Sequence, residues 1–155
     1  DAIGVKPLMA KNDPPAALHD PLDALLGYQL RRASSVMMAD LAAALRETGL
    51  RPVEASILLV IESSPGCTQS DVGRLLAIKR ANMVPLIAGL FKRDLIYRAP
   101  VDGRSQALFL SPAGETMARD ARKAIDTHEQ RFQVLFEDRQ VAALLDGLRL
   151  IRKHG

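Results

Sequence analysis

The side chains with the clearest chemical capacity lie in the stretch Lys79-Arg80-Ala81-Asn82, which opens a short segment of helical periodicity. Lysine and arginine bind phosphate oxygens, and an arginine guanidinium can also bind the O6 and N7 atoms of guanine. The side-chain amide of Asn82 can pair with the edge of an adenine. These residue types at the start of a helix favour double-stranded DNA as the partner.

Positive charge is concentrated around this stretch. The segment from residue 74 to residue 104 has a local balance of +5, whereas all 155 residues together have a formal net charge of +3. An evenly solvated surface would not show this concentration, which is typical of a nucleic-acid-binding region. Its charged residues are seven basic ones (Arg74, Lys79, Arg80, Lys92, Arg93, Arg98 and Arg104) and two acidic ones (Asp94 and Asp102).

A second polar set, Asp102-Gly103-Arg104, lies between two β-like runs at residues 95–99 and 106–110. Asp-Gly is a strong signal for a hairpin turn. An arginine at a hairpin tip can enter a narrow, electronegative minor groove. Asp102 is close enough in sequence to orient Arg104 through an ion pair, so both residues are predicted to lie at the DNA.

Short helices must hold these groups in place. A buried helix is predicted over 52–63, between Pro52 and Ser64-Pro65-Gly66. Thr68 and Asp71 form a capping-box variant that opens a helix to about residue 76, and a further helix runs from residue 79 or 80 to about 93. Pro85 removes one backbone hydrogen bond, to the carbonyl of Ala81, which is tolerable near a helix start.

The predicted order of elements is helix, short helix, tight connection, short helix and β-hairpin. This order is typical of a winged helix-turn-helix, which is predicted over residues 51–111. In that motif the first short helix crosses the DNA backbone, and the second enters the major groove with its first residues at the base edges. The predicted DNA contacts are therefore Thr68, Gln69 and Ser70 from the first helix, with Lys79, Arg80, Asn82 and Met83 from the second.

The outer parts of the chain show long amphipathic periodicity. Helices are predicted from Pro21 to Gly49, from Ser111-Pro112 to about residue 136, and from about 139 to 152. Their apolar stripes need a partner to cover them, so residues 21–50 and 112–155 are expected to form a helical dimerisation region. Residues 1–20 contain three prolines and are interpreted as an arm. The predicted fold class is mainly α.

The middle of the chain resembles the MarR family of bacterial transcriptional regulators. The similarity is carried by "TQSDVGRLL", "LIYR" and "DGRSQALFLSPAG", and extends over about residues 22–154. It implies a homodimer on pseudo-palindromic DNA and a small-molecule effector, often an aromatic acid or a related compound such as a thioester, bound between the dimerisation helices and the winged domain. The family commonly has arginine where Pro85 stands and Ser-Thr where Ala81-Asn82 stand. Base readout must therefore depend more on Arg80 and Asn82.

Arg32 continues an apolar stripe of the first long helix, where a charge needs a partner or must reach water. One interpretation is an ion pair with an acidic residue of the second subunit. The other is a site for a ligand carboxylate or phosphate, to which the neighbouring Arg31 and Ser35 could contribute.

Other chemistries have weaker support. The single cysteine, Cys67, precedes the Thr68 helix start and could serve a redox-responsive regulator, because a helix N-terminus can lower a thiol pKa. His19, His128 and His154 share no metal-ligand spacing, and His128 suits a satisfied core or interface histidine. No carboxylate pair, nucleophile triad or phosphate loop stands out, so we expect neither cofactor nor catalysis.

The composition limits the classes of protein to which this chain can belong. Apolar residues make up 48% of the chain, and no apolar run is longer than that of residues 57–61, which is far too short for a membrane span. No secretory signal is visible, so a cytoplasmic location is expected. The sequence favours a DNA-binding repressor released by a small ligand. The alternatives are a redox-responsive regulator using Cys67 and a winged-helix protein-assembly module that does not bind DNA.

Overall fold

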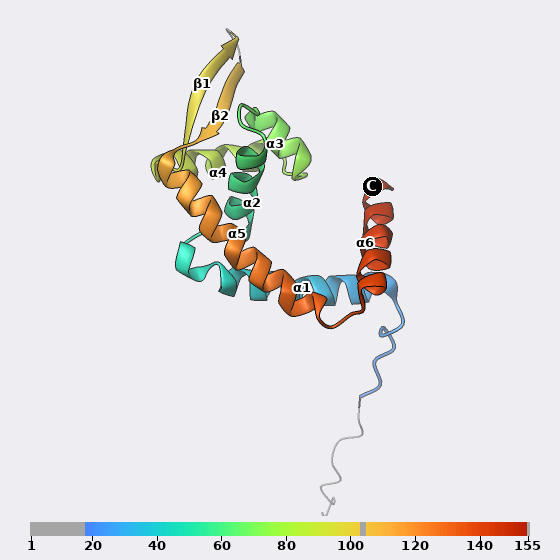
Figure 1. The fold of residues 1–155 in the computed structure, drawn as a ribbon. Helices are drawn as coiled ribbons and strands as arrows, with labels where there is room; N and C mark the ends of the chain where they lie inside the picture. Colours follow the sequence, from blue (N-terminus) through green and yellow to red (C-terminus); the bar gives the residue numbers. More distant parts are fainter. Residues whose placement is uncertain (1–17, 103–104, 155) are drawn as a thin grey trace, which may run out of the picture. The chain divides into compact units, whose positions relative to one another are not determined.

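The computed structural model describes residues 18–102 and 105–154. These residues form six α-helices, one short 3-10 helix and one antiparallel sheet of two strands (Figure 1). The predicted mainly α, winged-helix fold is confirmed. The chain divides into two compact units, residues 1–34 and 35–155. Within the described residues, no helix combines the length and the apolar character that crossing a membrane requires.

The first long helix, α1 (Leu26–Ala44), begins five residues later than predicted. Residues 21–24 form a turn instead, because the Asp20 carboxylate accepts a hydrogen bond from the Leu22 N–H at 2.9 Å. Helical bonding starts where the Gln29 N–H donates to the Leu25 carbonyl. At the other end the chain tightens into the 3-10 helix η1 (Arg46–Thr48), and Gly49 provides the predicted exit with a left-handed φ of 64°.

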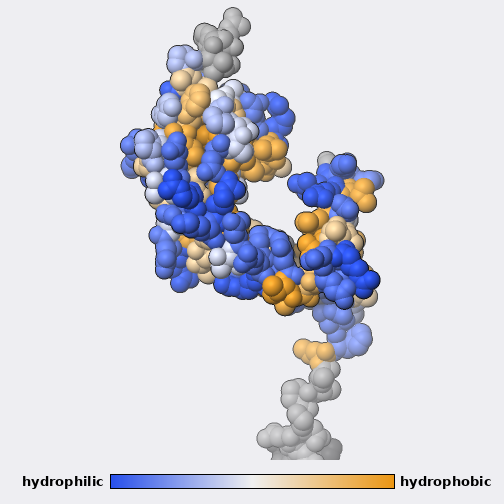
Figure 2. Space-filling model, in the orientation of Figure 1, coloured by the Kyte–Doolittle hydropathy of each residue, from blue (hydrophilic) through white to orange (hydrophobic). Residues whose placement is uncertain are grey.

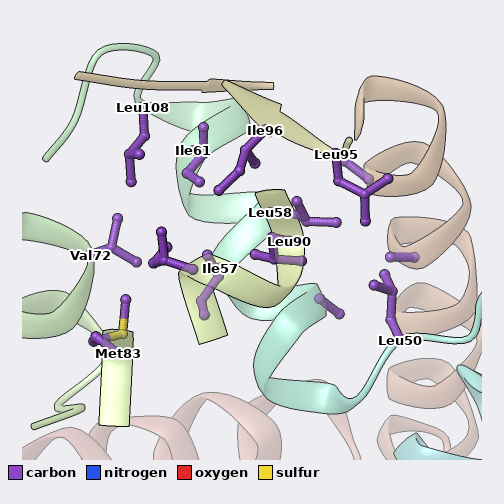
Figure 3. Close-up of a cluster of buried hydrophobic side chains, with 14 of the residues drawn as sticks. Leu50, Ile57, Leu58, Ile61, Val72, Met83, Leu90, Leu95, Ile96 and Leu108 are labelled. Atoms are coloured by element: carbon purple, nitrogen blue, oxygen red, sulfur yellow. The ribbon is translucent and has the colours of Figure 1, made fainter. Parts of the chain in front are cut away.

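Helix α2 (Pro52–Ser63) forms the centre of the core, and its bounds match the prediction. Its apolar side meets side chains from the later helices and the hairpin, as Figure 3 shows. Ile57, Leu58 and Ile61 are fully buried. Glu54 is buried at the start of α2, where it accepts hydrogen bonds from the backbone N–H of Arg51 (2.8 Å) and from its guanidinium (3.0 Å).

Helices α3 (Gln69–Leu75) and α4 (Arg80–Lys92) confirm the predicted helix-turn-helix. The capping box is present: the Asp71 N–H donates to Thr68 Oγ1 at 3.2 Å, and the Thr68 N–H donates to the Asp71 carboxylate at 3.0 Å. The connection between the two helices is tight because Gly73 has no side chain, which lets Ile78 and Met83 approach its backbone closely. A Cβ at Gly73 would lie 3.2 Å from both the Ile78 carbonyl oxygen and the Met83 side chain.

The hairpin strands are longer than predicted: β1 runs Ile96–Asp102 and β2 runs Ser105–Leu110. The register pairs Ile96 with Leu110 and Pro100 with Gln106, and an irregularity lies between Pro100 and Asp102. Residues 100–102, predicted as loop, thus belong to β1. Proline is acceptable there because each strand of a two-stranded sheet has an outer edge without a hydrogen-bonded neighbour.

The last two helices are α5 (Pro112–Gln133) and α6 (Asp138–Lys153). Ser111 caps α5 as predicted, since its Oγ accepts from the Gly114 N–H at 3.0 Å and donates to the Asp94 carbonyl. Helix α5 ends three residues earlier than predicted. The chain turns there to begin α6 with a new capping box, in which the Gln140 side chain accepts from the Glu137 N–H at 2.8 Å.

His128 ties the C-terminal half of α1 to α5. Its side chain is only 3% exposed, and Nδ1 lies 2.7 Å from the Asp40 carboxylate, which Arg131 also contacts. The hydrogen bond with His128 is the main reason that the pKa of Asp40 lies below its usual value. The prediction of a satisfied core histidine is confirmed.

Candidate nucleic-acid interface

A groove of about 580 Å³ lies where α3, the start of α4 and the hairpin meet. It brings together side chains that are far apart in the sequence, and its rim carries three exposed arginines. Its lining consists of Thr68, Gln69, Ser70, Gly73, Arg74, Ile78, Arg80, Met83, Arg98, Gln106 and Leu108. Five of the predicted contact residues therefore line one concave surface: Thr68, Gln69, Ser70, Arg80 and Met83.

Thr68 supports this surface through the backbone. Its hydroxyl donates to the Asp71 carboxylate at 2.7 Å and accepts from the Asp71 N–H, so both hydrogen-bonding directions are in use. This arrangement fixes the first turn of α3 and with it the positions of Gln69 and Ser70. Ser70 is exposed and Gln69 is half-buried.

Lys79, Arg80 and Asn82 are all exposed at the N-terminal end of α4. Lys79 is the extended residue that precedes the helix, and the first turn contains no acidic residue. The positive end of the helix dipole is therefore reinforced by two cations, an arrangement that attracts phosphate groups. Lys79 and Asn82 do not line the groove.

Met83, a predicted DNA contact, lines the groove but is almost fully buried, and its contact with DNA stays a prediction. The side chain is 1% exposed and belongs to the hydrophobic core with Ile87 and Leu90. Its position supports the first turn of α4 from behind. The burial of Met83 could have been predicted from the sequence, because residues 83, 87 and 90 follow the spacing of four and three that marks the buried face of a helix.

Three residues with charged or polar side chains line the groove but were not predicted as contacts: Arg74, Arg98 and Gln106. The guanidinium of Arg98 lies 4.5 Å from the centroid of the Phe91 ring, a cation–π contact that holds it at the surface. Arg98 pairs across the hairpin with Leu108, and Gln106 shares the sheet face of Leu108 two residues away. Only the strand register reveals this arrangement.

The predicted hairpin tip falls partly outside the described residues. Strand β1 is described to Asp102 and β2 from Ser105, whereas Gly103 and Arg104 lie outside the described part. The role of Arg104, and its ion pair with Asp102, stay predictions.

The environment of Cys67 argues against a reactive thiol. Burial raises the pKa of Cys67, and the negative charge of nearby Asp71 raises it further. Redox-sensing cysteines need the opposite, a lowered pKa that populates the thiolate. Over residues 18–102 and 105–154, no group of three histidine, cysteine, aspartate or glutamate side chains could hold a metal ion.

The candidate ligand residues lie on α1 with exposed side chains. Arg32 donates to the Tyr28 hydroxyl at 2.9 Å, and that hydroxyl donates to the Asp20 carboxylate at 3.0 Å. The guanidinium carbon of Arg31 lies 5.4 Å from the centroid of the same tyrosine ring. Two guanidiniums therefore flank one aromatic side chain. Ser35 follows one turn later on the helix.

Comparison with known proteins matches the MarR family model to residues 48–105, which include α2, α3, α4 and β1. The chain is 34% identical to the transcriptional repressor CouR bound to a 23-mer DNA duplex, with a TM-score of 0.79 over 84% of this chain and 94% of that one. CouR bound to p-coumaroyl-CoA shows 29% identity and a TM-score of 0.80 over 90% and 100% of the two chains. A protein of Thauera aromatica, whose assigned role is transcriptional regulation of the hcr operon, is 26% identical over 143 residues, 90% of this chain and 86% of its own.

Proposed function

Because this chain belongs to the MarR family of transcriptional regulators, we propose that it is a sequence-specific DNA-binding repressor released by an aromatic acid or its thioester. The observation that carries this proposal is the construction of α4. One side of the helix is fixed in the core by Met83, Ile87 and Leu90, while its N-terminal end exposes two cations and an amide. A rigid helix with a polar, positively charged tip is what major-groove reading requires.

The groove beside α4 supports the same proposal. Arg74, Arg80 and Arg98 come from three different elements and lie around one surface, where they can bind phosphates on both sides of a major groove. CouR, the 34% identical relative, is a repressor whose structure holds a DNA duplex. Arg104 at the hairpin tip is proposed to reach the adjoining minor groove.

We also propose a homodimer. Helix α6 buries none of its residues within the described chain, although it carries a stripe of leucines and an isoleucine. Figure 2 shows hydrophobic residues at the surface of α6. A second copy of the chain that covers this stripe would give a dimer with two-fold symmetry, which matches the symmetry of a pseudo-palindromic operator.

Replacing Asn82 separates base reading from phosphate binding. We expect Asn82→Ala to lower the affinity for a preferred duplex by about 1–3 kcal/mol while changing the affinity for shuffled DNA little, since amides read base edges. Lys79→Ala is the matched comparison and should weaken both duplexes equally, because lysine mainly binds phosphate. Fluorescence anisotropy titrations at fixed salt measure both. An equal loss on both duplexes for Asn82→Ala would place this residue at the backbone.

The effector class is proposed with support from the relatives. CouR is solved with p-coumaroyl-CoA, a thioester that combines an aromatic group with phosphates. In this chain Arg31 and Arg32 offer guanidiniums beside the Tyr28 ring, and guanidinium is well suited to phosphate or carboxylate. We propose that these arginines, with Ser35, take part in effector binding.

Arg32→Met tests this assignment. The side chain is exposed, so we expect the melting temperature and the DNA affinity without effector to stay at wild-type values. Release of DNA by p-coumaroyl-CoA should need about tenfold more compound, as expected from the loss of one charge-assisted hydrogen bond. Arg119→Met, an exposed arginine of α5, is the control and should release normally. Unchanged release in Arg32→Met would remove the arginine from the effector site, and a large loss of stability would make it part of the scaffold.

A further inference from the structure

Helix α4 has a second apolar face besides the one in the core. Val84 is 54% exposed, and Ala81, Pro85 and Ala88 are exposed as well. These positions follow the i, i+3, i+4, i+7 spacing, so they share one side of the helix, away from Met83, Ile87 and Leu90. An exposed apolar face on a helix whose core face is already complete points to an external partner.

The charges around this face define the partner. Lys79 and Arg80 are exposed before it and Lys92 after it, and the first turn of α4 lacks an acidic residue. An apolar strip between cations suits a polyanion that also offers apolar groups. The major groove of DNA meets both conditions, because phosphates border it and the C5-methyl group of thymine is the apolar group on its base edges.

We propose that Val84 reads a thymine methyl group in the major groove, with the Pro85 ring completing the apolar surface around it. This inference rests on the proposed DNA binding and adds a base identity to it. Val84 lies within one turn of Arg80 and two residues from Asn82, so the thymine belongs to the same half-site as the bases these residues read. Valine also disfavours adenine and cytosine at this place, since their major-groove amino group would lose its hydrogen bond to water against the valine methyls.

Replacing thymine with deoxyuridine removes only the methyl group and tests the proposal directly. The probe is the duplex that the wild-type protein enriches most from a random-sequence library, with each thymine replaced singly by deoxyuridine. We expect about fourfold weaker binding at one position in each half-site, the effect of one buried methyl group, and about 15-fold when both half-sites are changed. The other thymines should be insensitive.

Val84→Ala links this effect to the residue. The variant should bind thymine and deoxyuridine duplexes equally, and its fold should be unaffected because the side chain is exposed. Leu75→Ala is the matched control: Leu75 is an exposed apolar residue of α3, so this variant should keep the fourfold difference.

Two results would overturn the inference while leaving DNA binding intact. One is a wild-type protein that binds every deoxyuridine duplex as tightly as the thymine duplex, as expected if a protein surface covers Val84 instead. The other is a Val84→Ala variant that keeps the full methyl dependence. If the library yields no duplex bound more tightly than shuffled DNA, the proposed function fails, and the thymine contact fails with it.

Discussion

Replacing Leu144 and Leu145 together with aspartate is expected to convert the protein to a monomer and to lower its affinity for a preferred duplex by about 100-fold or more. These side chains are 46% and 44% exposed in the single chain and lie on the apolar stripe of α6. A carboxylate against an apolar partner surface costs several kcal/mol, which is enough to separate two subunits. A monomer then contacts one half-site and loses the gain from linked binding.

Sedimentation equilibrium and DNA titration on the same preparation measure both effects. Leu150→Asp is the matched control, because Leu150 is also exposed but lies on the opposite side of α6 by helical periodicity. It should remain dimeric and bind DNA normally. A dimer that survives both aspartates would locate the subunit interface elsewhere.

Gly114→Ala is expected to cause the largest loss of stability from a single methyl group. A Cβ at Gly114 would lie 1.8 Å from the carbonyl oxygen of Leu95, which is backbone and cannot rotate away. The start of α5 would have to move from the hairpin, although the Ser111 N–H donates to that same Leu95 carbonyl at 3.1 Å. Such overpacking costs about 3 kcal/mol or more.

Urea unfolding of Gly147→Ala provides the comparison for Gly114→Ala. Gly147 lies inside α6, where a Cβ would meet nothing within 4 Å. Alanine there should be neutral or should stabilise the helix by about 1 kcal/mol. Equal unfolding free energies for the two variants would show that the contact between α5 and the hairpin is not under steric constraint.

Local signals explain why much of the fold could be predicted. The bounds of α2 and α3 follow from Pro52 and from the Thr68–Asp71 capping box, whose physics involves only neighbouring residues. The predicted start of α1 was wrong because Pro21 suggested a helix start, whereas the Asp20 carboxylate stabilises a turn. The extra length of β1 was missed because Pro100 normally signals a loop.

The residues of the candidate site also differ in whether local sequence signals could identify them. Gln69, Ser70 and Arg80 were predicted because helix starts are visible in the sequence, and the structure places them around one groove. Arg98 and Gln106 were missed because the register across the hairpin decides which face of the sheet they occupy. The burial of Met83 was missed because its nearness to the helix start outweighed its place in the buried stripe.

Sequence-dependent DNA binding by this chain is tested most directly by titrating one preferred and one shuffled duplex at several salt concentrations. We predict that the logarithm of the affinity falls steeply and linearly with the logarithm of the salt concentration, because lysines and arginines displace counterions from phosphates. At physiological salt the preferred duplex should bind about 1,000-fold more tightly or better. Affinities that are weak, insensitive to salt and equal for both duplexes would contradict sequence-dependent DNA binding and favour a winged-helix module for protein assembly.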